Sequence, residues 1–113
     1  MPPRQAILVL LGLAVGCRPA ARGDDAVRYI PVAGGAALPF SAAVRVGPLL
    51  YLSGQIGVDS AGHLVPSGIS GETRQALENI RTELERSGSS LDRVVKCTAM
   101  LADIHDWGVM NQV

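Results

Sequence analysis

The sequence predicts one α+β domain in which helices cover a single face of a small β-sheet. Two observations lead to this fold class. Short apolar runs bounded by Gly and Pro fill residues 27–57, and a segment with helical periodicity extends from Ser70 to Ser87. A chain of 113 residues holds at most one domain. No second layer of helices is predicted, so the other face of the sheet would need a partner subunit.

The N-terminal region is predicted to precede the domain. Residues 1–16 are typical of a signal peptide, with a charged start, an apolar stretch and small residues at a cleavage site. Cys17 follows Ala-Val-Gly as in a bacterial lipobox, which predicts lipidation of Cys17 and a tether over residues 17–25. The predicted location is therefore exported, as a membrane-anchored lipoprotein or a periplasmic protein, with membrane contact through the lipid only. Plain secretion and a misassigned start codon are the alternatives.

Charge and cysteine content narrow the classes of partner. The chain has 10 basic and 10 acidic residues, a balance that offers no electrostatic footprint for nucleic acid. If Cys17 carries a lipid, Cys97 has no disulfide partner. We then expect Cys97 to be a buried small hydrophobic residue.

Three strands are expected in the first half of the domain. Residues 27–30 form the first candidate, which ends at Pro31. Residues 40–46 alternate loosely and meet the apolar run from Leu49 across Gly47-Pro48, which predicts an antiparallel hairpin. Residues 59–62 are typical of a turn, and residues 64–66 of a short extended piece.

The run 49–57 has the chemistry of a binding site at its end. It stops at Ser53-Gly54-Gln55, which places a hydroxyl, an unobstructed backbone N–H and an amide together. Such a corner can form the floor of a pocket for a small polar ligand. The alternative is a strand that simply turns at Gly54 and leaves Gln55 in solvent, and these residues alone favour that alternative.

Residues 70–87 predict the main helix. Its apolar stripe consists of Ile69, Thr73, Ala76, Leu77, Ile80 and Leu84. Its solvent face consists of Glu72, Arg74, Glu78, Arg81, Glu85 and Arg86. Gly88 stands where a left-handed C-cap belongs. Beyond a turn at residues 90–93, residues 94–101 alternate as in a strand, and Asp103 or Asp106 can cap a second helix that begins near Ile104.

Five separated segments resemble, in order, the motifs of the RidA family, also called YjgF or endoribonuclease L-PSP. These segments are 39–44 (PFSAAV), 52–56 (LSGQI), 75–80 (QALENI), 94–98 (VVKCT) and 103–111 (DIHDWGVMN). The resemblance implies that residues 26–113 form a chorismate-mutase-like α+β domain with an antiparallel or mixed sheet. It also implies a homotrimer with ligand clefts between adjacent subunits.

The activity implied by the resemblance is hydrolysis of reactive enamines and imines, such as 2-aminoacrylate, to a keto acid and ammonia. Some family members are described as ribonucleases. The ligand would be a small imine, enamine or carboxylate, and neither a metal nor an organic cofactor is implied. Matched by position, the substrate-binding residues are Phe40 in place of the family's usual tyrosine, Ser53, Gly54 and Asn111. No catalytic residue is identified.

The sequence departs from the family at its C-terminus. Family domains continue through the rest of the second helix and two strands, which carry an arginine for the substrate carboxylate and a glutamate near the reacting atom. This chain ends at Val113, so we expect a truncated member with impaired deaminase activity. A non-catalytic, trimeric ligand-binding module and a non-functional fragment are the alternatives.

Other polar residues have simpler interpretations. Arg45, Arg74 and Arg93 do not match the family arginine and are interpreted as surface charges. His63 and His105 have no nucleophilic partner at a recognisable spacing, so both are expected in solvent. Asp103 and Asp106 flank His105, but capping of a helix explains this cluster without a metal.

Overall fold

The computed structural model describes residues 26–35 and 38–113. The predicted signal peptide (1–16) and the tether that includes Cys17 lie outside the described residues, so these assignments stay predictions. Within the described ranges, no helix is both long and apolar enough to cross a membrane.

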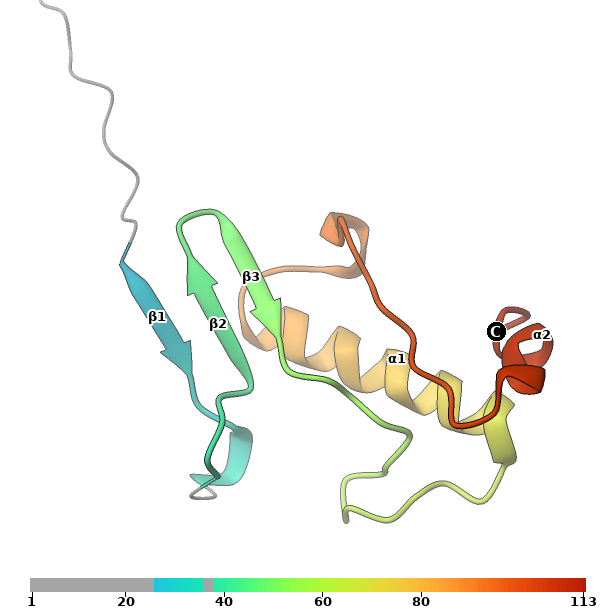
Figure 1. The fold of residues 1–113 in the computed structure, drawn as a ribbon. Helices are drawn as coiled ribbons and strands as arrows, with labels where there is room; N and C mark the ends of the chain where they lie inside the picture. The colour runs from blue at the N-terminus through green and yellow to red at the C-terminus, as the bar shows by residue number, and fades with distance from the viewer. Residues whose placement is uncertain (1–25, 36–37) are drawn as a thin grey trace, which may run out of the picture.

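The first half of the domain is a three-stranded antiparallel sheet (Figure 1). Its strands are β1 (Val27–Ile30), β2 (Ala43–Val46) and β3 (Leu49–Leu52), which lie in the order β1-β2-β3. Gly47 has a φ of 54° in the turn between β2 and β3, a left-handed conformation that favours glycine. The predicted first strand and hairpin are confirmed, although β2 begins at Ala43 and not at Phe40.

The two faces of the sheet differ in what covers them. Ala43 is buried, and its neighbour two residues on, Arg45, contacts the end of the long helix, so these alternate positions face the helix. The opposite face, called here the outer face, carries two cross-strand rows. These rows are Val27, Val46 and Leu49, and Tyr29, Val44 and Tyr51. Five of these six side chains are exposed, Tyr29 most of all at 71%.

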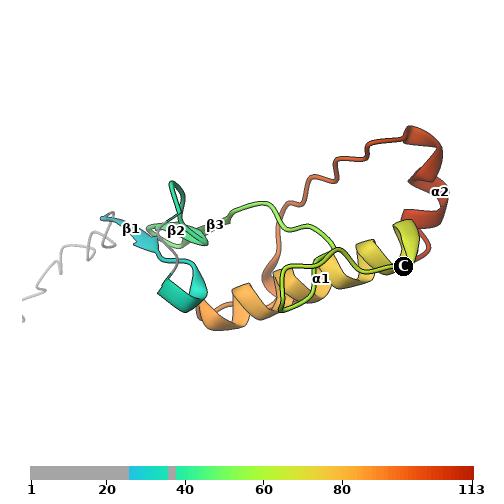
Figure 2. The ribbon, with the colours of Figure 1, turned by 90° about the horizontal axis from the view of Figure 1, so that it is seen from below.

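The helix α1 (Gly68–Arg86) crosses the inner side of the sheet (Figures 1 and 2). It ends as the sequence predicts. Gly88 has a φ of 75°, and the N–H groups of Gly88 and Ser89 donate to the carbonyls of Glu85 and Leu84 at 3.0 and 2.8 Å. This pair of bonds is a Schellman motif, which satisfies two carbonyls that the helix itself leaves free.

The buried side of α1 is rotated from the predicted stripe. Leu84 is buried, but Leu77 is 41% exposed. Glu72, predicted to face solvent, is half-buried, because Gly57 lies against its backbone. At about 100° per residue, Leu77 and Glu72 lie at opposite edges of the predicted apolar stripe. The buried face of α1 is therefore rotated away from Leu77 and toward Glu72, and this one rotation explains both differences. The sheet covers only the C-terminal part of α1, and the loop after β3 packs along the rest (Figure 2).

The predicted strand at residues 94–101 is wrong. The chain leaves a short 3-10 turn (Leu91–Arg93) in extended conformation, but pairs with no strand of the described sheet. An extended segment becomes a strand only when a neighbour supplies hydrogen-bond partners, and β3 lies apart from this segment in both views (Figures 1 and 2). Residues 94–100 are all exposed, so the prediction of a buried Cys97 is also wrong.

The C-terminal end forms a short helical pair. A 3-10 turn (Ile104–Asp106) leads into α2 (Trp107–Met110), which lies beside the N-terminal end of α1 (Figure 1). Asp103 caps this turn as predicted, because its Oδ1 accepts from the N–H of His105 at 2.9 Å. The alternative cap, Asp106, makes no such side-chain bond.

Candidate functional site

The end of β3 brings two of the family-matched segments together. The N–H of Ser53 donates to the carbonyl of Ala42 at 2.9 Å, and Ser53 Oγ donates to the carbonyl of Ser41 at 2.6 Å. Phe40 directly precedes this contact, and 57% of its surface is exposed. The hairpin therefore places Phe40, Ser53 and Gly54 at one corner of the sheet, which we call the Ser53–Gly54 corner.

Gly54 offers an accessible donor at this corner. A Cβ added to Gly54 would meet nothing within 4 Å, and the residue is exposed. Its N–H makes no hydrogen bond to any other described residue. Gln55 is half-buried, with Nε2 at 3.4 Å from the carbonyl of Ser53, and so does not project freely into solvent. The corner can donate one hydrogen bond to a ligand through Gly54 and accept one through the Ser53 hydroxyl.

Asn79 of α1 fixes the loop that follows this corner. Its Nδ2 donates to the carbonyls of Ile56 and Val58 at 3.0 and 2.9 Å, and its Oδ1 accepts from Gln75 Nε2 at 3.0 Å. Both the NH₂ group and the oxygen of the Asn79 side-chain amide are therefore hydrogen-bonded. Sequence reasoning assigned Asn79 no role. The available signal was its place in the QALENI segment, at the edge of the helix that turned out to be covered.

Asn111 lies far from the Ser53–Gly54 corner within one chain. It follows α2 directly, and both views show α2 at the opposite end of α1 from the sheet (Figures 1 and 2). Asn111 is exposed. Of the four predicted substrate-binding residues, one chain thus brings together Phe40, Ser53 and Gly54, but not Asn111.

Arg45 is not the solvated surface charge that the sequence suggested. It is half-buried, and its Nη2 donates to the carbonyl of Ser87 at 2.6 Å, which ties β2 to the C-terminal end of α1. Arg74 and Arg93 are exposed, as predicted. The partner of Arg45 lies 42 residues away in the sequence, so local pattern could not reveal this contact.

Both histidines are exposed, as predicted, and His105 forms a local pair with Asp103. The Nδ1 of His105 lies 2.7 Å from Oδ1 of Asp103. The backbone N–H of His105, followed by its side chain, lowers the pKa of Asp103 below the ordinary value of 3.8. No group of three or more His, Cys, Asp or Glu residues suited to a metal occurs within residues 26–35 and 38–113.

The Asp103 cap predicts a specific pH dependence. A carboxyl group whose pKa falls on folding contributes stability that is fully present above the unfolded pKa of 3.8. This contribution is lost as the pH falls through the lowered folded value. Because the backbone N–H is the larger cause, His105→Ala should keep most of the lowering. An NMR titration of the Asp103 carboxyl checks this, and a return to the ordinary pKa in His105→Ala would contradict it.

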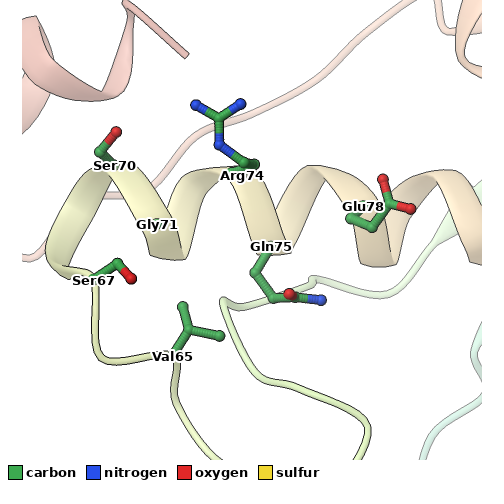
Figure 3. A pocket seen from close by; sticks show the side chains of 7 residues that line it. All are labelled: Val65, Ser67, Ser70, Gly71, Arg74, Gln75 and Glu78. Atoms are coloured by element: carbon green, nitrogen blue, oxygen red, sulfur yellow. The ribbon is translucent and has the colours of Figure 1, made fainter.

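Neither of two surface hollows in the described part of the chain contains a predicted substrate-binding residue. One, of about 570 Å³, lies near the start of α1 (Figure 3). Figure 3 shows Ser70 and Arg74 on one side of α1, while Val65 and Gln75 lie on the other. The polar groups around this hollow therefore do not converge on one point. The second hollow, of about 590 Å³, lies between the sheet and the C-terminal end of α1.

Comparisons of this chain with family models, known sequences and solved structures all lead to one family. The family model described as Endoribonuclease L-PSP matches residues 32–113. A mouse protein named 2-iminobutanoate/2-iminopropanoate deaminase is 45% identical over 76 residues, which make up 66% of this chain and 56% of the mouse protein. The structure of YyfA, a Rid-family protein from Yersinia pestis, has a TM-score of 0.69 at 34% identity and covers 77% of this chain and 71% of that one. RidA from an Antarctic Psychrobacter has a TM-score of 0.63 at 36% identity, with coverage of 74% and 66%.

These matches fit the structure and the sequence motifs alike. The chain spans a little over half the length of the mouse relative, 56%, and the part matched by the family model, residues 32–113, includes β2, β3 and both helices. The α+β architecture is that of the matched structures. The chain therefore belongs to the endoribonuclease L-PSP family, which is the RidA or YjgF family.

Proposed function

We propose that this chain forms part of a site that hydrolyses small imines and enamines to a keto acid and ammonia. The observation that carries the proposal is the Ser53–Gly54 corner. There the N–H of Gly54 has no partner among the described residues, and the space where a Cβ of Gly54 would stand is open. Support comes from relatives 45% identical that are named deaminases of 2-iminobutanoate and 2-iminopropanoate.

The chemistry fits the groups at this corner. Water adds to the carbon of the C=N bond while the nitrogen gains a proton, and the resulting carbinolamine then loses ammonia to leave a carbonyl. The N–H of Gly54 can hold a carboxylate oxygen of the substrate, because a backbone donor costs no reorganisation. The Ser53 hydroxyl donates to Ser41 and so keeps its lone pairs for the attacking water or the nitrogen. Phe40 has no hydroxyl, so it can only pack against the substrate.

A site that also uses Asn111 requires a second copy of the chain. The distance between α2 and the corner prevents one chain from presenting both to the same ligand (Figure 1). The exposed outer face of the sheet provides an apolar surface for such association. The proposed assembly is the homotrimer of the family, with each cleft shared between neighbours.

The test is release of ammonia and pyruvate from enzymatically generated 2-aminoacrylate. The full chain should release product above the uncatalysed rate. Ser53→Ala should lower kcat/KM about tenfold, the value of one hydrogen bond of about 1.4 kcal/mol. Ser60→Ala, in the exposed turn, is the matched control and should not change it. Equal activity in both variants would show that Ser53 does not contribute to the site. Absence of activity in the parent would contradict the proposed hydrolysis.

A chimera and a binding measurement separate activity from binding. The resemblance to the family implies an arginine for the substrate carboxylate in the C-terminal part of the complete domain. We therefore expect higher turnover when the C-terminal part of the mouse deaminase is appended. The competing function is a binding module without turnover, which the lack of an assigned general base favours. Saturable binding of 2-oxobutanoate to the parent, with no product release from either protein, would establish that alternative.

A further inference from the structure

The second hollow brings three arginines together, and none of its lining residues belongs to the Ser53–Gly54 corner. Arg28 from β1, Arg45 from β2 and Arg86 from α1 all line its volume of about 590 Å³. Arg28 and Arg45 are direct cross-strand partners, so both project from the same face of the sheet. That face is the inner one, because Arg45 bonds to the end of α1.

Two of the three guanidinium groups are held in place by backbone carbonyls. Arg45 Nη2 donates to Ser87 at 2.6 Å, and Arg86 Nη2 donates to Pro31 at 2.6 Å. A guanidinium has five N–H donors, so each keeps others for a ligand. The side chain of Arg28 makes no hydrogen bond or ion pair to any other described residue. The cluster thus combines two fixed cations with one available cation.

The charges of this cluster are only partly balanced within the described residues. No acidic residue lines the hollow, and the only ion pair that an arginine of the cluster makes to a described residue joins Arg86 Nη1 to Glu83 Oε2 at 3.5 Å. The C-terminal end of α1 adds only a partial negative charge. Like charges at directly opposed strand positions destabilise a sheet, so Arg28 and Arg45 oppose folding unless an anion lies between them.

We propose that this hollow binds a phosphate group. Forked guanidinium donors match the oxygens of phosphate in bidentate fashion, and a dianion balances the side-chain charge of the cluster better than a single carboxylate does. The volume lies within the range of small-molecule pockets, about 300–1,000 Å³, and so leaves room for a small phosphorylated molecule. This site is independent of the proposed imine hydrolysis.

Titration of the full chain with inorganic phosphate at constant ionic strength tests the proposal, with binding followed by NMR. Arg28→Gln should raise the Kd for phosphate about tenfold, because it removes a charge-assisted hydrogen bond without breaking a side-chain contact of the described fold. Arg81→Gln is the matched control. It removes the same charge from an exposed pair with Glu78, elsewhere on α1, and should leave the Kd unchanged. Far-UV circular dichroism verifies that both variants are folded.

Vesicles distinguish a soluble phosphate from a lipid headgroup. Co-sedimentation of the parent with phosphatidylglycerol vesicles but not phosphatidylcholine vesicles, reduced by Arg28→Gln, would assign the site to lipid headgroups. Phosphate binding without vesicle binding would assign it to soluble phosphorylated molecules. Absence of saturable phosphate binding, or equal loss of affinity in Arg28→Gln and Arg81→Gln, would overturn the proposal.

Discussion

Replacing Gly57 with alanine is expected to release the loop after β3 from α1. A Cβ at this position would lie 2.5 Å from the Cα of Glu72 and 2.7 Å from its carbonyl oxygen. These are backbone atoms of a helix and cannot move aside as a flexible side chain would. Overpacking of this kind costs about 1–3 kcal/mol. The displaced loop would also lose the hydrogen bonds from Asn79 to Ile56 and Val58, at about 1 kcal/mol each.

The measurement is a urea unfolding curve of Gly57→Ala against Gly54→Ala. The added Cβ at Gly54 meets open space, and its φ is not in the left-handed region, so this control should change stability by less than about 1 kcal/mol. Gly57→Ala should lose about 3–5 kcal/mol, a large part of the 5–15 kcal/mol typical of a domain. Limited proteolysis gives a second readout, since the freed loop should be cut sooner. Equal midpoints and cleavage rates in the two variants would contradict the close packing.

The elements that the sequence predicts correctly are those set by neighbouring residues. Gly47-Pro48 determines the hairpin, and Gly88 ends α1, because each needs only a local backbone conformation. The segment 94–101 alternates like a strand, yet a strand also needs a neighbour, which local sequence cannot specify. The same reason explains Cys97, whose exposure depends on what lies opposite.

In the candidate site, too, local contacts can be predicted from the sequence and distant ones cannot. The hairpin brings the Phe40 segment to the Ser53–Gly54 corner, and a hairpin can be predicted from sequence. The anchoring of the next loop by Asn79 spans 21 residues, and no local periodicity signals it. Asn111 is separated from the corner by the length of α1, and the sequence does predict that length. Its consequence for assembly appears only when the helix is seen to run away from the sheet (Figure 1).

The proposed self-association through the outer face is expected to be lost when Val44 becomes aspartate. Val44 lies between Tyr29 and Tyr51 in the central row of that face. An unpaired carboxylate buried there would weaken association at least about a hundredfold. Leu77→Asp is the matched control, because Leu77 is an exposed apolar residue of α1, away from this face. Sedimentation velocity should show an oligomer for the parent and Leu77→Asp, and a monomer for Val44→Asp.

The same pair of variants tests whether the site needs two subunits. The buried apolar side chains of the described structure are few and include only Ala42, Ala43 and Leu84, so association should also contribute to stability and make Tm depend on concentration. Because Asn111 and the Ser53–Gly54 corner lie at opposite ends of α1, a ligand that contacts both must sit between two copies. Val44→Asp should therefore lose imine hydrolysis along with the oligomer, while Leu77→Asp keeps both. Full activity in a monomeric Val44→Asp protein would show that the corner of a single chain is sufficient, without Asn111.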